Sequence, residues 1–446
     1  MTVLQKEMIF SLSSGAGRAG VSVFRVSGEG SYGLALKLSG KRRLKARYAY
    51  LAKLRDADKS MIDEALVLYF PAPHSFTGED VVEFHCHGSP AVASAISRCL
   101  NHYKVRQAEA GEFTRRAVIN GQMDLTQAEG LADLIDSETD GQHKQALRQM
   151  QGGLRDIYAE WKETLLDALA QIEGEIDFPD EEDIPDALSH KAHPILSNIR
   201  DDMQKLLQDA QRGQRVRDGV SITLLGAPNS GKSSIINRLA KNDIAIVTDQ
   251  AGTTRDIIST DLIIAGLPVT VSDTAGLRET HDVIEGEGVR RARVKAHESD
   301  LRLWVVDINS KDSLLPPDEL EAGDIVLLNK IDQNDSADLD VGEGFTSFKV
   351  SAKTGEGLDD FQSHLEELVK TRFAPLGHAG LTRARHKDCI LRAEGSIARA
   401  IDVLGKAPEL AGEDIRRALQ ALKELAGDVD IESVFDRIFS RFCVGK

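Results

Sequence analysis

A phosphate-binding loop is the clearest chemical signal in the sequence. The pattern Gly-x-x-x-x-Gly-Lys-Ser begins at Gly226, directly after an apolar, strand-like run at residues 222–225, and a helix-like run follows it. Glycines let backbone N–H groups wrap around phosphate oxygens, the lysine brings positive charge to the β- and γ-phosphates, and the serine hydroxyl can ligate Mg²⁺. The residues expected to bind the nucleotide here are Asn229, Ser230, Gly231, Lys232, Ser233 and Ser234, with Lys232 also aiding catalysis and Ser233 holding the metal.

Two later motifs predict the metal and base contacts. An aspartate that ends a strand can hold Mg²⁺ through water, and a glycine after it can donate its N–H to the γ-phosphate. A second aspartate, in Asn-Lys-x-Asp, can accept from both N1–H and N2–H of guanine, which adenine lacks, so the substrate is predicted to be GTP rather than ATP. These motifs are Asp273-Thr274-Ala275-Gly276 and Asn329-Lys330-Ile331-Asp332, with Ser351, Ala352 and Lys353 completing the base pocket.

A threonine-rich segment between the first two motifs predicts a switch loop. In Gly252-Thr253-Thr254-Arg255-Asp256 a threonine can close over the γ-phosphate and ligate Mg²⁺, and we favour Thr254; in isolation a simple polar turn would explain the same residues. Ras-type enzymes orient the attacking water with a glutamine after Asp-x-x-Gly, but Leu277 stands at that position. Another residue must orient the water, and four acidic candidates follow: Glu279, Asp282, Glu285 and Glu287.

Composition limits the partners and the compartment. The formal net charge is -16, so any RNA contact must be local; the basic stretches at residues 40–47 and 289–295 are candidates, although such runs are more often solvated. No segment approaches the roughly 18 apolar residues of a membrane span, and the start lacks the pattern of a signal peptide. With only four widely spaced cysteines, the sequence predicts a cytoplasmic protein with no membrane association.

Residue patterns divide the chain into segments of different fold class. Residues 1–121 mix strand-like runs, at 21–26 and 65–70, with one helix-like stretch at 90–100, which predicts an α+β domain. Helical spacing dominates residues 122–215 and 373–446, apart from an acidic, proline-containing break at 177–185. In residues 216–372 β-branched runs alternate with helical segments, as in a parallel α/β sheet, so we expect a Ras-like G domain inserted into an all-α domain. Its expected strands are 222–225, 269–271, 301–306, 325–328 and 348–350.

Motifs along nearly the whole chain resemble the MnmE (TrmE) family of tRNA wobble-uridine modification GTPases. Within the G domain these are Asn229 in the phosphate loop, the segment at 252–256, Leu277 and the acidic segment after it. Outside it they are the segments at residues 20–28, 75–80, 87–88 and 111–114, Glu83, and the ending Phe442-Cys443-Val444-Gly445-Lys446.

The resemblance implies potassium-activated GTP hydrolysis. In that family the G domains dimerise when GTP is bound, and K⁺ takes the place of an arginine finger, which suits charge neutralisation in the transition state. Carried over by position, Glu285 orients the water, and Asn229, Thr248, Gln250 and Thr253 surround K⁺. The nucleotide- and ion-binding segment then comprises Thr248, Asp249, Gln250, Ala251, Gly252, Thr253 and Thr254.

The resemblance also implies a one-carbon cofactor and partners. The family's N-terminal domain forms a constitutive homodimer and binds 5-formyl- or methylene-tetrahydrofolate. Carried over by position, the folate site involves Arg25, Glu83, Gln122 and Lys446. The family's C-terminal motif also implies that Cys443 is a functional thiol. The family commonly has lysine where this chain has Gln122, so that contact loses its charge here. A flavin- and NADH-dependent protein similar to MnmG (GidA) and tRNA are the implied partners.

Other interpretations remain open. Without the family, Arg25 and Glu83 would be taken as an ordinary surface ion pair. The group His85-Cys86-His87 suits no common zinc spacing and is expected to be structural, because strand alternation places its side chains on both faces. A switch GTPase that assists ribosome assembly by binding alone is the alternative function. A folate-binding carrier with a vestigial G domain is disfavoured by the complete nucleotide motifs.

Overall fold

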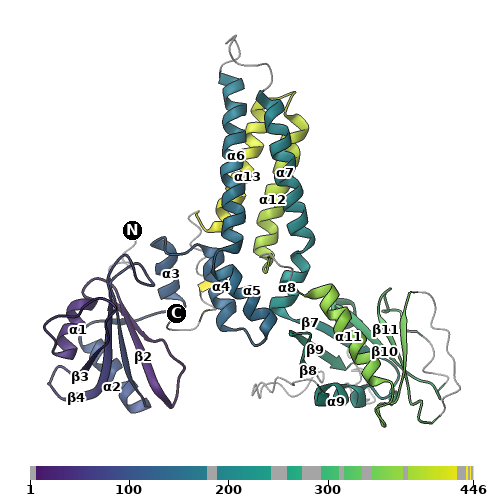
Figure 1. Ribbon diagram of the computed structural model, residues 1–446, viewed down its shortest axis with the longest axis horizontal. Coiled ribbons are helices and arrows are strands. Elements are labelled where there is room, and N and C mark those ends of the chain that lie inside the picture. The colour runs from purple at the N-terminus through teal and green to yellow at the C-terminus, as the bar shows by residue number, and fades with distance from the viewer. Residues whose placement is uncertain are drawn as a thin grey trace, which may run out of the picture. The chain divides into compact units, whose positions relative to one another are not determined.

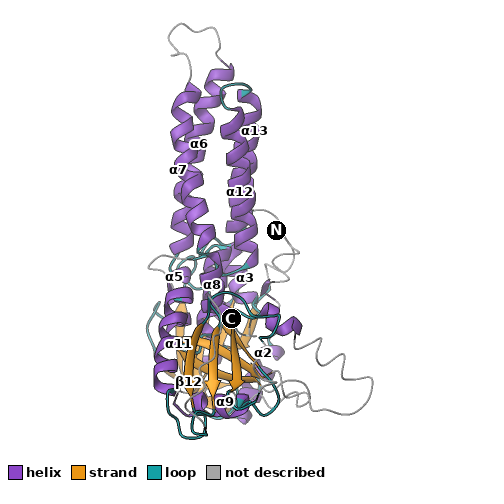
Figure 2. Cartoon of the chain, turned by 90° about the vertical axis from the view of Figure 1, so that its right-hand side faces the viewer, coloured by secondary structure: helices purple, strands orange, loops and turns teal. Residues whose placement is uncertain are grey.

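The structure is a computed structural model that mixes helices and sheets (Figures 1 and 2). It describes residues 7–177, 188–242, 259–273, 293–310, 316–333, 344–374, 380–428, 438–439, 442 and 445. The chain forms two compact units: the first comprises Met1–Ala132, Gln149–Ala159 and Leu419–Lys446, and the second comprises Asp133–Arg148 and Glu160–Ala418. None of the described helices is both long and apolar enough to cross a membrane.

The first unit is built on a mixed sheet in the order β3-β4-β5-β2-β1-β6. All neighbouring strands are antiparallel except β1 and β6, which are parallel. Alternation of apolar and polar residues leaves one face for the core and one for other contacts. The strands are β1 (Ile9–Leu12), β2 (Ala19–Ser27), β3 (Tyr50–Arg55), β4 (Met61–Phe70), β5 (Val81–Gly88) and β6 (Arg106–Gln107).

Two helices cover the core face of this sheet. Leu34 and Leu38 of α1 (Ser31–Ser39) and Ile96 and Leu100 of α2 (Pro90–His102) pack in one cluster with strand residues such as Phe84. The helices α3 (Glu112–Ile119) and α4 (Leu125–Ile135) follow in the chain. The prediction of an α+β region was right, but its single helix at 90–100 was incomplete. The sequence reading missed α1, which is short and weakly amphipathic, and α3, which spans only two turns.

The second unit contains a mainly parallel sheet in the order β12-β11-β10-β7-β9-β8. Its strands are β7 (Val220–Leu225), β8 (Ser259–Ile264), β9 (Leu267–Asp273), β10 (Leu301–Asp307), β11 (Ile325–Asn329) and β12 (Thr346–Val350). All five strands expected from the sequence are present. The edge strand β8 was missed; it pairs antiparallel with β9 through a two-residue turn in which Ala265 and Gly266 both have positive φ. Alanine rarely adopts positive φ, so the sequence carries only the glycine as a signal for this hairpin.

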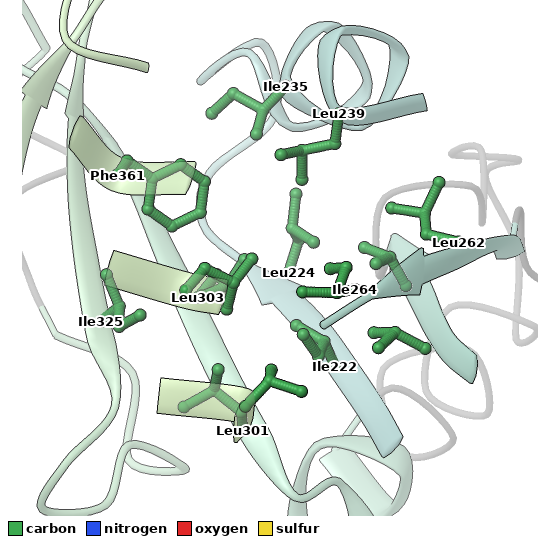
Figure 3. Packing of buried hydrophobic residues seen from close by; sticks show 14 of the residues in the cluster. Ile222, Leu224, Ile235, Leu239, Leu262, Ile264, Leu301, Leu303, Ile325 and Phe361 are labelled. Carbon is green, nitrogen blue, oxygen red and sulfur yellow. The ribbon is translucent and has the colours of Figure 1, made fainter. Parts of the chain in front are cut away.

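Successive side chains of these strands enter opposite cores, which is why the strands read as continuous apolar runs. Figure 3 shows Leu224 and Leu303 facing Ile235 and Leu239 of α9 (Lys232–Asn242) and Phe361 of α11 (Leu358–Phe373). The next residues along the strands, including Leu225 and Trp304, join a second buried cluster. The sheet is thereby fixed from both faces, which holds its strand ends in place for a site.

Long helices make up most of the rest of the second unit. The helices α6 (Gly153–Asp177), α7 (Leu188–Gln208), α12 (Ala384–Val403) and α13 (Pro408–Ala426) run side by side in both views (Figures 1 and 2). The expected acidic break falls between α6 and α7, and its prolines lie outside the described residues. The shorter α5 (Asp140–Met150) and α8 (Ala210–Asp218) complete the helical part, and α8 leads directly into β7.

Candidate functional site

Four loops of the second unit begin where neighbouring parallel strands end. Gly226 follows β7, Asp273 ends β9, Asp307 ends β10 and Asn329 ends β11. These strands are adjacent in the order β11-β10-β7-β9 and all run parallel. Carboxyl ends of parallel strands meet at one edge, so the three motifs predicted from the sequence are brought together there.

The loop between β7 and α9 has the backbone that a phosphate cradle requires. Gly226 has φ +139°, and a Cβ there would lie 2.2 Å from the Val305 carbonyl oxygen, so only glycine fits. Asn229 adopts a left-handed φ of 62° although it is not glycine. Such outliers concentrate at binding loops, where the surrounding structure holds them. The loop therefore turns sharply beside β10 and leads into the N-terminus of α9.

Lys232 lies at the first residue of α9 and is only 3% exposed. Its ammonium donates to the carbonyl oxygens of Gly226, at 2.6 Å, and Ala227, at 2.9 Å. Burial lowers the pKa of Lys232, and the nearby Asp273 carboxylate opposes that shift. A buried cation held by neutral carbonyls gains strongly from a phosphate, because an anion would offset the cost of its desolvation.

Ser233 and Asp273 form a pair of hard oxygen donors. The Ser233 hydroxyl donates to Asp273 Oδ2 at 2.9 Å, and the carboxylate itself is buried. Hydroxyl, carboxylate and phosphate oxygens with water are the donor set that Mg²⁺ prefers. The two residues therefore fit the metal position predicted for them. Ser234, the next residue, is exposed on α9.

Asn329 ties the phosphate loop to the loop after β12. Its side-chain amide donates to the Ser230 carbonyl at 2.7 Å, and its amide oxygen accepts from the Ala352 N–H at 3.0 Å. Gly231 must stay small, because a Cβ there would lie 2.1 Å from Asn329 Nδ2. This bridging role was not assigned from the sequence, and one buried side chain now links three of the predicted loops.

Asp332, the aspartate predicted to contact guanine, is positioned by its neighbours. Asp332 Oδ1 accepts from the Ser351 hydroxyl at 2.8 Å, and Oδ2 lies 4.0 Å from the Lys353 ammonium. Arg238 of α9 donates to the carbonyl oxygens of Ala352 and Lys353. The acceptor predicted for guanine is therefore held at the same end of the sheet as the phosphate loop.

Lys330 has an ion pair that the sequence reading missed. Its ammonium lies 2.6 Å from Asp307 Oδ2, at the end of the neighbouring strand, and its backbone has φ +72°. Burial raises the pKa of Asp307, but hydrogen bonds from Lys330 and Asn309 outweigh it, and the net pKa is lowered. Asp307 therefore stays ionised and fixes the lysine side chain.

Several predicted residues lie outside the described part of the chain. They include the whole switch loop, the three residues after Asp273, the predicted water-positioning residue, and the C-terminal thiol and lysine. Named in full they are Thr248, Asp249, Gln250, Ala251, Gly252, Thr253, Thr254, Thr274, Ala275, Gly276, Glu285, Cys443 and Lys446. Their predicted roles stay predictions.

A second candidate site lies on the sheet of the first unit. Arg25 on β2 is the register partner of Glu83 on β5, and their side chains form an ion pair at 3.0 Å. A hydrogen bond from His85 and the charge of Arg25 lower the pKa of Glu83 against the opposing effect of burial. Arg25 and Glu83, which the family resemblance places in the folate site, are therefore in contact. The same contact would be found if they formed an ordinary ion pair.

Two aromatic rings beside Arg25 were not singled out from the sequence. Its guanidinium lies 5.1 Å from the centre of the Phe76 ring and 5.8 Å from that of Phe113. Both rings belong to segments that carry the family resemblance, at residues 75–80 and 111–114. These segments could therefore have indicated the two rings as candidate site residues. A cation between two aromatic faces forms a flat, partly apolar wall.

The remaining predicted residues near this sheet are placed as follows. Gln122 is exposed and donates to the Asn120 carbonyl at 3.4 Å; in the described part of the chain no hydrogen bond joins it to Arg25 or Glu83. The terminal segment reaches this unit, since the Ser13 hydroxyl donates to the Gly445 carbonyl at 2.9 Å.

The group His85-Cys86-His87 is split between the two faces of β5, as expected. Cys86 is buried, and burial raises the pKa of its thiol to about 12. His85 contacts Glu83, and the exposed His87 contacts Asp63 at 2.7 Å. Among the described residues no group of side chains suits a metal ion by itself.

Comparison with known proteins decides the family. The family described as MnmE helical domain matches residues 125–443, and the family described as GTP-binding protein TrmE N-terminus matches residues 8–122. The tRNA modification GTPase MnmE of Maricaulis maris is 50% identical over 439 residues, which cover 98% of this chain and 99% of that protein. The chain belongs to the MnmE family.

A second relative agrees along the full length. The tRNA modification GTPase MnmE of Paramagnetospirillum magneticum is 46% identical over 448 residues, covering 99% of this chain and all of that protein. Among solved structures, the G domain of the T. maritima FeoB iron transporter matches at 24% identity and a TM-score of 0.25, covering 33% of this chain and 97% of that one. The N-terminal family match includes Arg25, Glu83 and both aromatic rings beside them.

Proposed function

We propose that this MnmE-family chain is a GTP hydrolase that modifies carbon 5 of the wobble uridine of tRNA. The observation that carries the proposal is the convergence of Lys232, Asp273 and the Asn329 to Asp332 loop at one sheet edge, in a chain similar over its full length to tRNA modification GTPases. The group installed is of the aminomethyl or carboxymethylaminomethyl type, and a tetrahydrofolate derivative supplies its carbon.

The residues divide the work of GTP hydrolysis. Lys232 and the N–H groups of residues 229–234 would bind the phosphates, and Ser233, Thr254 and Asp273 would hold Mg²⁺, with Asp273 acting through water. Mg²⁺ supplies charge neutralisation on the β- and γ-phosphates when it is bound. Asp332, with Ser351, Ala352 and Lys353 beside it, selects guanine, and Glu285 orients the attacking water.

Potassium and dimerisation belong to the same proposal. Asn229, Thr248, Gln250 and Thr253 are proposed to surround K⁺ when two G domains meet, because Leu277 cannot orient water and no arginine finger is assigned. GTP hydrolysis measured in potassium and in sodium chloride at equal ionic strength tests this. We expect a rate at least tenfold higher in potassium, within the range of one added transition-state contact, and equal rates would remove the cation mechanism.

The first unit is proposed to hold the folate and to dimerise. Arg25 and Glu83 offer a cation and an acceptor on one wall, and the rings of Phe76 and Phe113 provide flat surface. Gly445, whose carbonyl accepts from the Ser13 hydroxyl, stands between Cys443 and Lys446 in the sequence. Gln122 is the weakest member of the set, since it has no charge. The partners are a second copy of the chain, an MnmG-like flavin- and NADH-dependent protein, and tRNA in the cytoplasm.

We also propose the division of the chain into domains. Residues 1–121 form the α+β domain, residues 122–215 and 373–446 form the helical domain, and residues 216–372 form an inserted G domain. The support is that β7 to β12 complete one sheet while α8 precedes it and α12 follows it in the chain.

Nucleoside mass spectrometry of tRNA tests the function as a whole. Deleting the gene should leave wobble uridine without its carbon-5 group, and the intact gene should restore it. The Lys232→Ala variant should fail to restore it, because nucleotide binding is lost. Normal modification in the deletion strain would reject the proposal.

A further inference from the structure

The loop between α1 and β3 concentrates positive charge in an acidic protein. Residues 41–47 read Lys-Arg-Arg-Leu-Lys-Ala-Arg, with five cations and no carboxylate, while the chain carries a formal net charge of -16. Like charges so close together repel one another at low ionic strength. This repulsion lowers the stability of the folded loop, so a role in binding an anion explains the charge better than a role in the fold alone.

The backbone of this loop is fixed. Leu44 is 3% exposed and packs in the core of the first unit, and its N–H donates to the Tyr32 hydroxyl at 3.3 Å. The Lys45 N–H donates to the Tyr50 hydroxyl at 3.1 Å, and the Arg47 N–H donates to the Tyr69 carbonyl at 2.8 Å. The cations are therefore displayed from a pre-organised support, which reduces the entropy lost on binding.

The charged ends point to solvent. Arg42, Arg43, Lys45 and Arg47 are exposed, and among the described residues the side chains of the first three make no hydrogen bond or ion pair. Arg47 is held by the carbonyl oxygen of His74 and lies over the Phe70 ring, 5.8 Å from its centre. Arg42, Arg43 and Lys45 are therefore available to an external anion.

An exposed aromatic side chain adjoins the cations. Tyr48 is 56% exposed and lies 4.9 Å from Tyr50, ring centre to ring centre, which supports it from one side. Cations interleaved with an aromatic ring suit a polymer of phosphates and bases, since an unpaired base can stack on the ring. An anionic protein surface offers the charge but not the bases.

We propose that residues 41–48, the basic loop, bind the phosphate backbone of tRNA. The inference rests on the proposed function, which makes tRNA the substrate, and adds where part of it is held. A chain of this net charge must confine its RNA contact to a local cationic surface. The other basic stretch noted in the sequence, residues 289–295, lies mostly outside the described residues.

The test removes two positive charges of the basic loop and measures how the affinity for tRNA depends on salt concentration. In Arg42→Gln/Arg43→Gln, affinity for an unmodified tRNA transcript, measured by fluorescence anisotropy, should fall about tenfold at moderate salt. The slope of log affinity against log salt should shrink by about one to two, because each lost phosphate contact contributes about 0.7 to 0.9. GTP hydrolysis and the thermal unfolding midpoint should stay unchanged, since neither side chain has a structural contact.

The matched control is Arg98→Gln/Lys104→Gln. It removes two exposed cations from α2 and the residue just after its C-cap, in the same unit, with the same change in net charge. We expect wild-type affinity and slope. Unchanged tRNA binding in the basic-loop variant, an equal loss in the control, or no tRNA binding by the wild type would each overturn the proposal.

Two other readouts separate related ideas. If tRNA binding is unchanged and binding to the flavin-dependent partner is weakened, the loop binds protein and the proposal is wrong. Failure of the tRNA inference leaves the proposed function intact, because nucleoside analysis of the deletion strain reports on modification independently.

Discussion

The nucleotide site of the second unit and the Arg25–Glu83 site of the first stand on sheets of different construction. In the second unit, functional groups follow the ends of parallel strands, and each group lies in a short contiguous motif. In the first unit, Arg25 and Glu83 are 58 residues apart in sequence and meet as side chains across two antiparallel strands.

This difference explains how each site depends on its scaffold. A strand-end site uses backbone groups and loop conformations, such as the turn at Gly226, so it requires particular residues at fixed spacing. A cross-strand site depends on side-chain pairs whose register is set by the whole sheet. The nucleotide site should therefore be the more sensitive to single substitutions of its motif residues.

The largest expected effect is on base recognition. Asp332→Asn removes the carboxylate proposed to accept from guanine N1–H and N2–H, so we expect the dissociation constant for GDP to rise at least about 10³-fold. Fluorescence titration with a labelled guanine nucleotide measures it. Asp318→Asn, an exposed aspartate in the same unit, should bind normally, and an unaffected Asp332 variant would separate this loop from the site.

Next in size is the chemical step. Glu285→Ala should keep GTP affinity and slow turnover by roughly 10²-fold or more, since a positioned base or water-orienting group contributes about 10² to 10⁴. Single-turnover hydrolysis is the measurement, with Glu287→Ala as the control. If the control loses turnover and Glu285→Ala does not, the water-orienting role passes to Glu287.

A core substitution tests how far the strand-end site depends on its sheet. Leu224 is fully buried between α9 and the strands, so Leu224→Ala should lower the free energy of unfolding by about 3–5 kcal/mol. Chemical denaturation followed by the fluorescence of the buried Trp304 reports on the same sheet. The control Leu391→Ala, which is 47% exposed, should cost under about 1 kcal/mol; equal losses would contradict the assigned core.

The cross-strand site should respond more mildly. Arg25→Gln removes the charge beside Glu83 and is expected to weaken binding of 5-formyltetrahydrofolate about tenfold, as for one charge-assisted hydrogen bond. Nucleotide affinity should not change. Isothermal calorimetry measures both, with the exposed Arg55→Gln as control, and unchanged folate binding would leave Arg25–Glu83 as a purely structural pair.

The smallest effect is the pH dependence of the first unit. Contacts from His85 and Arg25 hold the pKa of Glu83 below its ordinary value of 4.5, so the ionised form stabilises the fold above that pH and the benefit disappears as pH falls through the lowered pKa. Thermal unfolding of wild type and Glu83→Gln should therefore converge in acid. Glu64→Gln, an exposed β4 carboxylate, should show no such convergence, and parallel curves for Glu83→Gln would refute the linkage.

The strand-end site was readable from the sequence to a large extent. Strand-like runs before Gly226, Asp273, Asn329 and Ser351 were recognised, and the structure has β7, β9, β11 and β12 there. Recognition of phosphate and base requires a fixed local geometry, so the residues that provide it occur together in short sequence motifs. Asp307 escaped notice because nothing within its own segment marks it, and its role depends on a neighbouring strand that brings Lys330 within 2.6 Å.

By itself, the sequence determined the order of the nucleotide motifs and the alternation of α+β, helical and α/β segments, and it predicted Asp332 as the guanine contact. Only the tertiary structure decided that Phe76 and Phe113 flank Arg25, that Asn329 joins Ser230 to Ala352, and that the cations of residues 41–47 stand on a fixed loop. The physical reason is the separation in sequence between the residues that make each contact. Motif chemistry is set by neighbours along the chain, whereas these contacts depend on strand register and packing between segments far apart in sequence.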